Sequence, residues 1–242
     1  MAGLILAIIV FCTMMIGMVF GDRDWRNADH SSAGLAPDPE ETPEAVVQVY
    51  AARTFNWRGA FAVHTWIATK EKNATAYKVY QVIGFNIWRG LSAVSIKEDI
   101  PDRRWYNAQP WIIDDLRGEA AEKAIPYIRK AAENYPYRKV YHAWPGPNSN
   151  TFIATLIRET PQLKVELPPL AIGKDWLKGN ALWARSESGT GIQLSLFGLL
   201  GMTIGVNEGL EINILGLVFG VDFKNPALKL PMVGRIGMQD RG

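Results

Sequence analysis

The residue types best suited to chemistry form a small polar cluster, Asn148-Ser149-Asn150-Thr151, which directly follows Trp144-Pro145-Gly146-Pro147. Asn148 is a good N-cap, and the apolar positions that follow predict a helix beginning at Ser149. A hydroxyl in a first helical turn lies near unpaired backbone N–H groups and the positive end of the helix dipole. This arrangement suits a nucleophile beside an oxyanion site, although a capped surface helix explains the same residues without chemistry.

His64 is the histidine best placed to act as a general base. It stands in the middle of an alternating run over residues 60–69, on the strand face that also carries Trp66. A buried imidazole there needs a polar partner, and Gln81 on the next predicted strand is the candidate to orient it. The alternative is a structural histidine satisfied within the core.

These residues define a hypothetical Ser/His site for cleaving or transferring an amide or ester. Ser149 attacks, His64 accepts its proton, Gln81 orients His64, and backbone N–H groups hold the oxyanion. The residues expected to line the substrate are Asn148, Asn150, Thr151, Trp66 and Trp144. His142 competes as a base, although its aromatic neighbours favour packing. The sequence shows neither metal-ligand spacing nor a phosphate-binding glycine motif, so no metal and no cofactor is expected.

Composition narrows the possible functions. The chain has 242 residues and a formal net charge of +2, so no basic surface for nucleic acid is expected. Cys12 is the only cysteine, which excludes a disulfide framework and a thiolate zinc site.

The first 21 residues predict a transmembrane anchor or signal segment. They carry no charged side chain, and residues 4–20 are almost wholly apolar, just enough to span a bilayer. Arg23 and Arg26 follow the segment, so a strict count of positive charges favours a cytoplasmic body. A short apolar segment before a globular body is more typical of export, and we expect an inner-membrane anchor with a periplasmic body. Residues 22–42 are expected to be a tether.

The body is expected over residues 43–190 as an α+β fold, with helices packed on an antiparallel sheet. Alternating patterns predict four strands, at 47–51, 60–69, 77–85 and 91–97. Helical spacing over 111–134 predicts an amphipathic helix. Gly118 and Pro126 fit that helix badly, so it either kinks or begins late.

Residues 191–242 are expected to form an apolar β-hairpin and a tail. Two apolar runs, 192–205 and 209–221, contain frequent glycines and are joined by a short polar turn, which favours a long hairpin with two apolar faces. Such a hairpin is either buried in the core or covered by the bilayer or a membrane-protein partner. The candidate surface for that contact is residues 191–222.

Three segments together resemble a family of bacterial envelope proteins of unknown function. They are Phe61-Ala62-Val63-His64-Thr65-Trp66-Ile67-Ala68, Trp144-Pro145-Gly146-Pro147-Asn148-Ser149-Asn150-Thr151-Phe152 and Leu167-Pro168-Pro169-Leu170-Ala171-Ile172-Gly173-Lys174-Asp175. The similarity covers residues 35 to the C-terminus and implies no activity.

A more distant resemblance links the chain to circularly permuted papain-like domains, such as NlpC-type peptidases and lecithin-retinol-acyltransferase-like enzymes. His64, Gln81 and residues 148–152 follow the order of those domains, but Ser149 stands where they have cysteine. The resemblance implies a membrane-anchored envelope hydrolase or acyltransferase for a peptide, lipoprotein or acyl ester. Because an alcohol, unlike a thiol, needs a base to lose its proton, the alternative is an inactive binding or assembly module, or an accessory subunit of a membrane complex.

Overall fold

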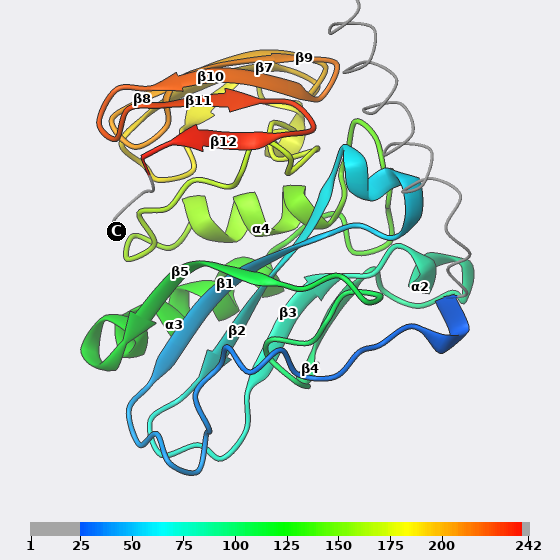
Figure 1. The fold of residues 1–242 in the computed structure, drawn as a ribbon, viewed down its shortest axis with the longest axis vertical. Helices are drawn as coiled ribbons and strands as arrows, with labels where there is room; N and C mark the ends of the chain where they lie inside the picture. Colours follow the sequence, from blue (N-terminus) through cyan, green and yellow to red (C-terminus); the bar gives the residue numbers. More distant parts are fainter. Residues whose placement is uncertain (1–24, 239–242) are drawn as a thin grey trace, which may run out of the picture.

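The computed structural model describes residues 25–238, which form two antiparallel sheets with helix α4 between them (Figure 1). The α+β fold class expected from the sequence is confirmed. The predicted anchor over residues 1–21, with Cys12, lies outside the described residues. Within residues 25–238, no helix has the length and apolar character needed to cross a bilayer.

The N-terminal sheet has five strands in the order β4-β3-β2-β1-β5. The predicted meander of four strands is present, and a further strand adds to the free edge of β1. The strands are β1 (Val46–Arg53), β2 (Val63–Lys70), β3 (Lys78–Val82), β4 (Val94–Glu98) and β5 (Trp111–Arg117).

The predicted helix over residues 111–134 begins later than its spacing suggested. Trp111–Arg117 is strand β5, because its backbone pairs with β1 along most of its length. Helix α3 (Gly118–Glu133) follows and contains Pro126. Gly118 supplies the positive φ of 54° at the change from strand to helix, a conformation that glycine adopts without strain.

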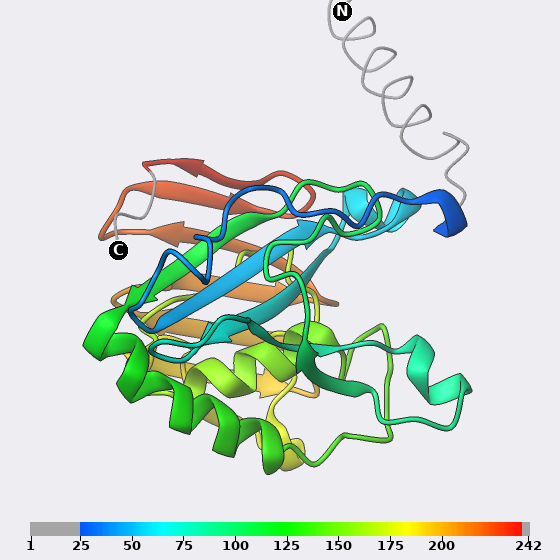
Figure 2. The ribbon, with the colours of Figure 1, turned by 90° about the horizontal axis from the view of Figure 1, so that it is seen from below.

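The predicted helix at Ser149 is confirmed as α4 (Ser149–Arg158), with Asn148 as its N-cap. Figure 2 shows α3 and α4 on the same side of the N-terminal sheet. Their buried side chains form the main core with inward residues of the sheet, among them Val49, Ile67 and Val82. The remaining helical elements are short: η1 (Trp25–Asn27), η2 (Asn56–Ala60), α2 (Phe85–Trp88) and η3 (Lys178–Asn180).

The opposite face of the N-terminal sheet is covered by chain that was expected to be a tether. Leu35 packs there together with Trp105 against the buried Trp66. Asp102 accepts hydrogen bonds from Ser32 Oγ and from the Leu35 backbone N–H. The described part of segment 22–42 is therefore docked on the body in this region.

The C-terminal sheet has seven strands in simple meander order, β12-β11-β10-β9-β8-β7-β6. The strands are β6 (Trp183–Arg185), β7 (Gly191–Leu196), β8 (Leu200–Gly205), β9 (Gly209–Ile214), β10 (Leu217–Asp222), β11 (Ala227–Leu230) and β12 (Gly234–Gly237).

The turn expected at residues 206–209 is present between β8 and β9, but the single long hairpin expected over residues 191–222 is wrong, since this stretch makes four strands, β7 to β10. The expectation missed two tight turns whose residues are apolar. Phe197 (φ 53°) opens the β7–β8 turn, and Leu215 (φ 56°) with Gly216 (φ 86°) makes the β9–β10 turn. Hairpin turns that need positive φ usually carry Asn or Gly, so leucine and phenylalanine concealed them.

Candidate functional site

His64 is a buried, stacked side chain on the covered face of the N-terminal sheet. Its ring centroid lies 3.6 Å from that of Trp105 and 5.7 Å from that of Trp66, nearly parallel to the former. Its Nε2 is 3.4 Å from Gln81 Oε1, so the expected His64–Gln81 contact is formed. Burial lowers the pKa of His64 to about 3, which keeps the imidazole neutral at pH 7.

This burial predicts that His64 makes the fold sensitive to acid. The folded-state pKa lies below the ordinary 6.5, so the unfolded chain binds the proton first and stability falls as pH drops below 6.5. The variant His64→Phe keeps a ring in the stack but cannot bind this proton. Between pH 7 and pH 5, the unfolding free energy of the wild type should therefore fall by about 2 kcal/mol more than that of His64→Phe. Urea unfolding at both pH values measures this difference, and parallel pH profiles for the two proteins would contradict it.

Ser149 is the first residue of α4 and is buried beside a fully formed capping box. The Asn148 side chain accepts hydrogen bonds from the backbone N–H groups of Asn150 (2.9 Å) and Thr151 (3.1 Å). Thr151 Oγ1 accepts one from the Asn148 N–H in return. The backbone N–H groups of Asn150 and Thr151 at the helix start are thus already used by the cap.

The polar neighbours of Ser149 fasten α4 to the rest of the body. Asn150 Nδ2 donates to the backbone carbonyls of Val63 (3.0 Å) and Ile172 (2.8 Å), which joins the helix to strand β2 and to the loop after residue 167. Thr151 Oγ1 donates to the carbonyl of Gly173 at 2.7 Å. We call Asn148, Asn150, Thr151 and Gly173 the α4 lock.

The structure does not bring Ser149 and His64 together. Thr65 Oγ1 donates to Asn150 Oδ1, so Thr65 points toward α4, and its neighbour His64 points to the other face because side chains alternate along a strand. The sheet itself therefore lies between the two. Among the described residues, no hydrogen bond links Ser149 Oγ to His64 or to the exposed His142.

The two tryptophans expected at the same site also lie apart. Trp66 is buried with His64, and its Nε1 donates to the carbonyl of Pro101 at 2.7 Å. Trp144 is half exposed at one end of the C-terminal sheet, where its Nε1 donates to the carbonyl of Leu215 at 2.8 Å. The expected catalytic and binding residues are consequently divided among three places.

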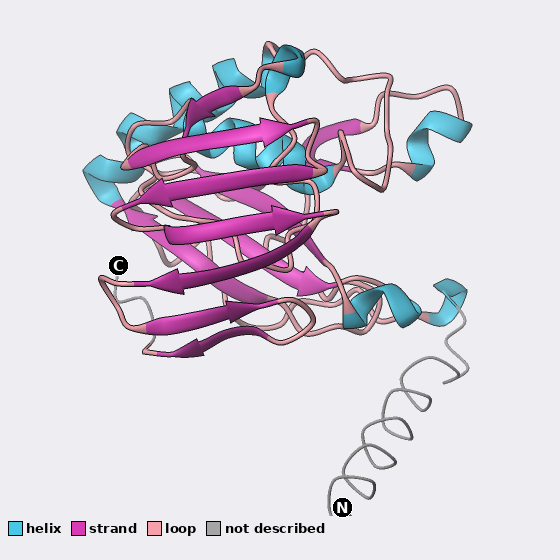
Figure 3. Cartoon of the chain, turned by 90° about the horizontal axis from the view of Figure 1, so that it is seen from above, coloured by secondary structure: helices cyan, strands magenta, loops and turns pink. Residues whose placement is uncertain are grey.

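The most unusual feature is the C-terminal sheet, whose polar side chains point inward and whose apolar side chains point outward. The face toward α4 carries the buried residues Gln193, Ser195, Thr203, Glu211, Asn213, Asp222 and Lys229. Every exposed side chain of β7 to β12 is apolar, and no described segment crosses this side of the sheet (Figure 3). We call this exposed, apolar side of the C-terminal sheet the outer face. Its residues are Ile192, Leu194, Leu196, Leu200, Met202, Ile204, Ile212, Ile214, Leu217, Phe219, Val221, Leu228 and Ile236.

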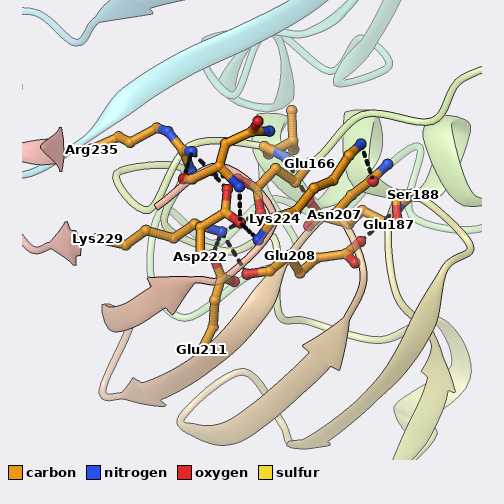
Figure 4. A network of polar contacts seen from close by, with 12 residues as sticks. Glu166, Glu187, Ser188, Asn207, Glu208, Glu211, Asp222, Lys224, Lys229 and Arg235 are labelled. Carbon is orange, nitrogen blue, oxygen red and sulfur yellow. Dashed lines mark hydrogen bonds and ion pairs between the residues drawn. The ribbon is translucent and has the colours of Figure 1, made fainter. Parts of the chain in front are cut away.

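The inner face is held to the body by a buried ionic network (Figure 4). Lys229 Nζ contacts the carboxylates of Glu166 and Glu211, the latter at 3.0 Å. The other oxygen of Glu211 lies 2.6 Å from Lys174 Nζ, and Arg235 pairs with Asp222 at 2.6 Å. Since Glu166 and Lys174 belong to the body, their pairs with Lys229 and Glu211 fix which face of the sheet points inward.

The carboxylates of this network differ in affinity for a proton. Burial, reinforced by the nearby Glu211 carboxylate, raises the pKa of Glu166 to about 7. Burial acts on Glu211 as well, but Lys174 and Lys229 outweigh it and lower the pKa of Glu211. Glu211, which touches both ammonium groups, is therefore the firmly charged centre of the network.

Residues 44–176 match the model of a protein family described as a protein of unknown function, DUF3750. The chain belongs to this family. The family membership expected from the sequence is confirmed to that extent. Neither the curated proteins nor the solved structures gave a match.

The DUF3750 match covers the N-terminal sheet, α3, α4 and the α4 lock, and it ends at Trp176, before β6 begins at Trp183. The C-terminal sheet thus lies outside the matched region. Its contact points on the body, Lys174 and Asp175, are among the last residues matched. The body of this DUF3750 member ends in charged groups that the C-terminal sheet covers.

Sequence reasoning named residues 191–222 as a possible contact surface, but it missed the network residues and the division of this sheet into a polar and an apolar face. A usable signal was present: within Ile192-Gln193-Leu194-Ser195-Leu196, and again within Glu211-Ile212-Asn213-Ile214, polar and apolar residues alternate strictly. Because the turns between these strands are also apolar, the short alternating runs join into two longer apolar runs, which conceals the alternation. The pattern shows that one face is polar, but it cannot show that the polar face is the buried one.

Proposed function

We propose that this chain is a membrane-anchored, non-catalytic docking module of the cell envelope, with its body in the periplasm and the outer face as its working surface. The observation that carries the proposal is that every exposed side chain of β7 to β12 is apolar. Monomeric soluble proteins rarely expose contiguous apolar patches of more than a few hundred Å², and larger ones mark contact sites.

The orientation of the sheet supports docking over an accidental patch. Turning the sheet over would bury its aliphatic side chains, but it would also expose Lys229, Glu211 and Asp222, which are now paired inside. Breaking a buried ion pair costs about 3–5 kcal/mol, so the ionic network holds the apolar face outward. A stable fold that maintains such a surface supports a role in contact with another hydrophobic body.

The geometry around Ser149 favours this module over a hydrolase or acyltransferase. A serine nucleophile needs a base within hydrogen-bond reach, and His64 is stacked on the other side of the sheet. Asn148, Asn150 and Thr151 are occupied in the α4 lock. In this proposal, the papain-like order of His64, Gln81 and residues 148–152 persists as a scaffold from which the thiol chemistry has been lost.

Thiol accessibility in native membranes tests the proposal. A Cys12→Ser background contains no other cysteine, and it receives either Phe219→Cys on the outer face or Lys123→Cys on exposed α3. Both variants are labelled with a water-soluble maleimide, and each labelling rate is divided by the rate of the same variant when unfolded. The normalised rate at Phe219→Cys should be at least about tenfold lower than that at Lys123→Cys. Equal normalised rates would show that the outer face is uncovered and would overturn the proposal.

A further inference from the structure

We infer that the outer face is covered by a lipid bilayer, so that the body lies on the membrane surface with the C-terminal sheet immersed in the boundary between headgroups and acyl chains. This inference rests on the proposed docking function and names its partner. An apolar face buried about 5–10 Å at this boundary is the geometry of monotopic membrane association.

The chemistry of the outer face fits hydrocarbon better than it fits another protein. Protein interfaces carry about ten hydrogen bonds and are only about 56–65% apolar. The exposed side chains of β7 to β12 offer no hydrogen-bonding group at all. The backbone groups between neighbouring strands are used in the sheet ladder, so little remains to fix the orientation of a protein partner. Lipid chains require no such group.

The polar boundary of the outer face also matches a membrane interface. On edge strand β6, Trp183 and Arg185 pair with Leu194 and Ile192 and therefore lie on the outer side of the sheet. Trp183 is 67% exposed. Tryptophan and arginine at the margin of an apolar surface are typical of side chains at headgroup level.

The ends of the sheet differ, which predicts a tilt. The end formed by the β7–β8, β9–β10 and β11–β12 turns exposes Phe197, Leu215 and Val233, with Trp144 beside them. The opposite end mixes the exposed Val206 and Phe223 with Asn207 and Lys224. We therefore infer that the Trp144 end lies deeper.

The start of the described chain agrees with this orientation. Helix η1 lies on the same side of the molecule as the Trp144 end of the sheet (Figures 1 and 3). The uncharged segment 1–21, long enough in sequence to anchor in a bilayer, precedes Trp25 by a few residues only. Although η1 does not lie at the outer face, an anchor on that side keeps the Trp144 end of the sheet nearer to the membrane than the opposite end (Figure 1).

Depth-dependent fluorescence quenching tests this inference on the full chain. Cys12→Ser protein carrying NBD at Phe219→Cys is reconstituted into vesicles of phosphatidylethanolamine and phosphatidylglycerol that contain doxyl-labelled lipid. We expect loss of at least about half of the emission, with shallow doxyl labels quenching more than deep ones. NBD at Lys123→Cys should keep its emission. Of the matched pair Val233→Cys and Val206→Cys, the former should be quenched more strongly.

The outcomes separate this inference from the proposed function. Absence of quenching at Phe219→Cys overturns lipid contact; if maleimide protection in native membranes persists, docking stands and the partner is a protein. Energy transfer between labelled copies without lipid quenching would identify that partner as a second copy of the chain. Equal quenching at Val233→Cys and Val206→Cys would refute the tilt. Loss of both quenching and protection would refute the inference and the proposed function together.

Discussion

Lys229→Met should lower the free energy of unfolding by about 3–5 kcal/mol, because it leaves a buried carboxylate without its cation. Lys229 is fully buried and contacts both Glu166 and Glu211, and its Nζ also donates to the carbonyl of Glu208 at 2.7 Å. Methionine fills similar space but cannot replace these contacts. Urea unfolding of the full chain at pH 7 measures the effect.

Lys123→Met is the matched control. Lys123 pairs only with the exposed Glu119 on α3, and surface substitutions of this kind change stability by roughly 0.5 kcal/mol or less. If Lys229→Met were as mild as Lys123→Met, the ionic network would not hold the C-terminal sheet in place. The outward position of the apolar face would then need a different physical cause.

Gly173→Ala should cost roughly 3 kcal/mol or more, because it combines backbone strain with loss of the α4 lock. Gly173 has a φ of 97°, and a Cβ there would lie 2.3 Å from Asn148 Nδ2. Asn148 would have to move and release the carbonyls of Ala143 and Ile172. The measurement is the urea unfolding free energy of the variant relative to wild type.

Gly179→Ala separates strain from collision. Gly179 also has a positive φ, 69°, but a Cβ there meets nothing within 4 Å, so we expect a cost of about 1–2 kcal/mol. Equal losses for the two variants would mean that the contact between Gly173 and Asn148 contributes little to the lock.

Local sequence signals predicted those elements whose cause is local. The helix at Ser149 follows from its N-cap and apolar spacing, and the α+β class follows from the strand patterns of the body. The helix predicted over residues 111–134 does begin late, after Arg117. Its first seven residues form strand β5 because they pair with β1, a partner sixty or more positions earlier in the chain.

Of the contacts expected in the candidate site, the structure forms the one between His64 and Gln81 but not the one between Ser149 and His64. His64 and Gln81 do meet, since neighbouring strands of a meander are adjacent. Whether Ser149 faces His64 depends on which side of the sheet α4 covers, and alternation alone cannot decide this. The same limit hid the C-terminal sheet, where the paired ions, and not hydrophobicity, determine which face is inside.

Ser149 and His64 stand on opposite faces of the N-terminal sheet, and on this geometry they form no catalytic pair. The direct test is to treat the full chain with a fluorophosphonate in native membranes and to measure by mass spectrometry whether the Ser149 hydroxyl is modified. We expect Ser149 to stay unmodified, because its expected base, His64, lies on the other side of the sheet. Stoichiometric modification at Ser149 that disappears in His64→Ala would contradict the separation of the two residues.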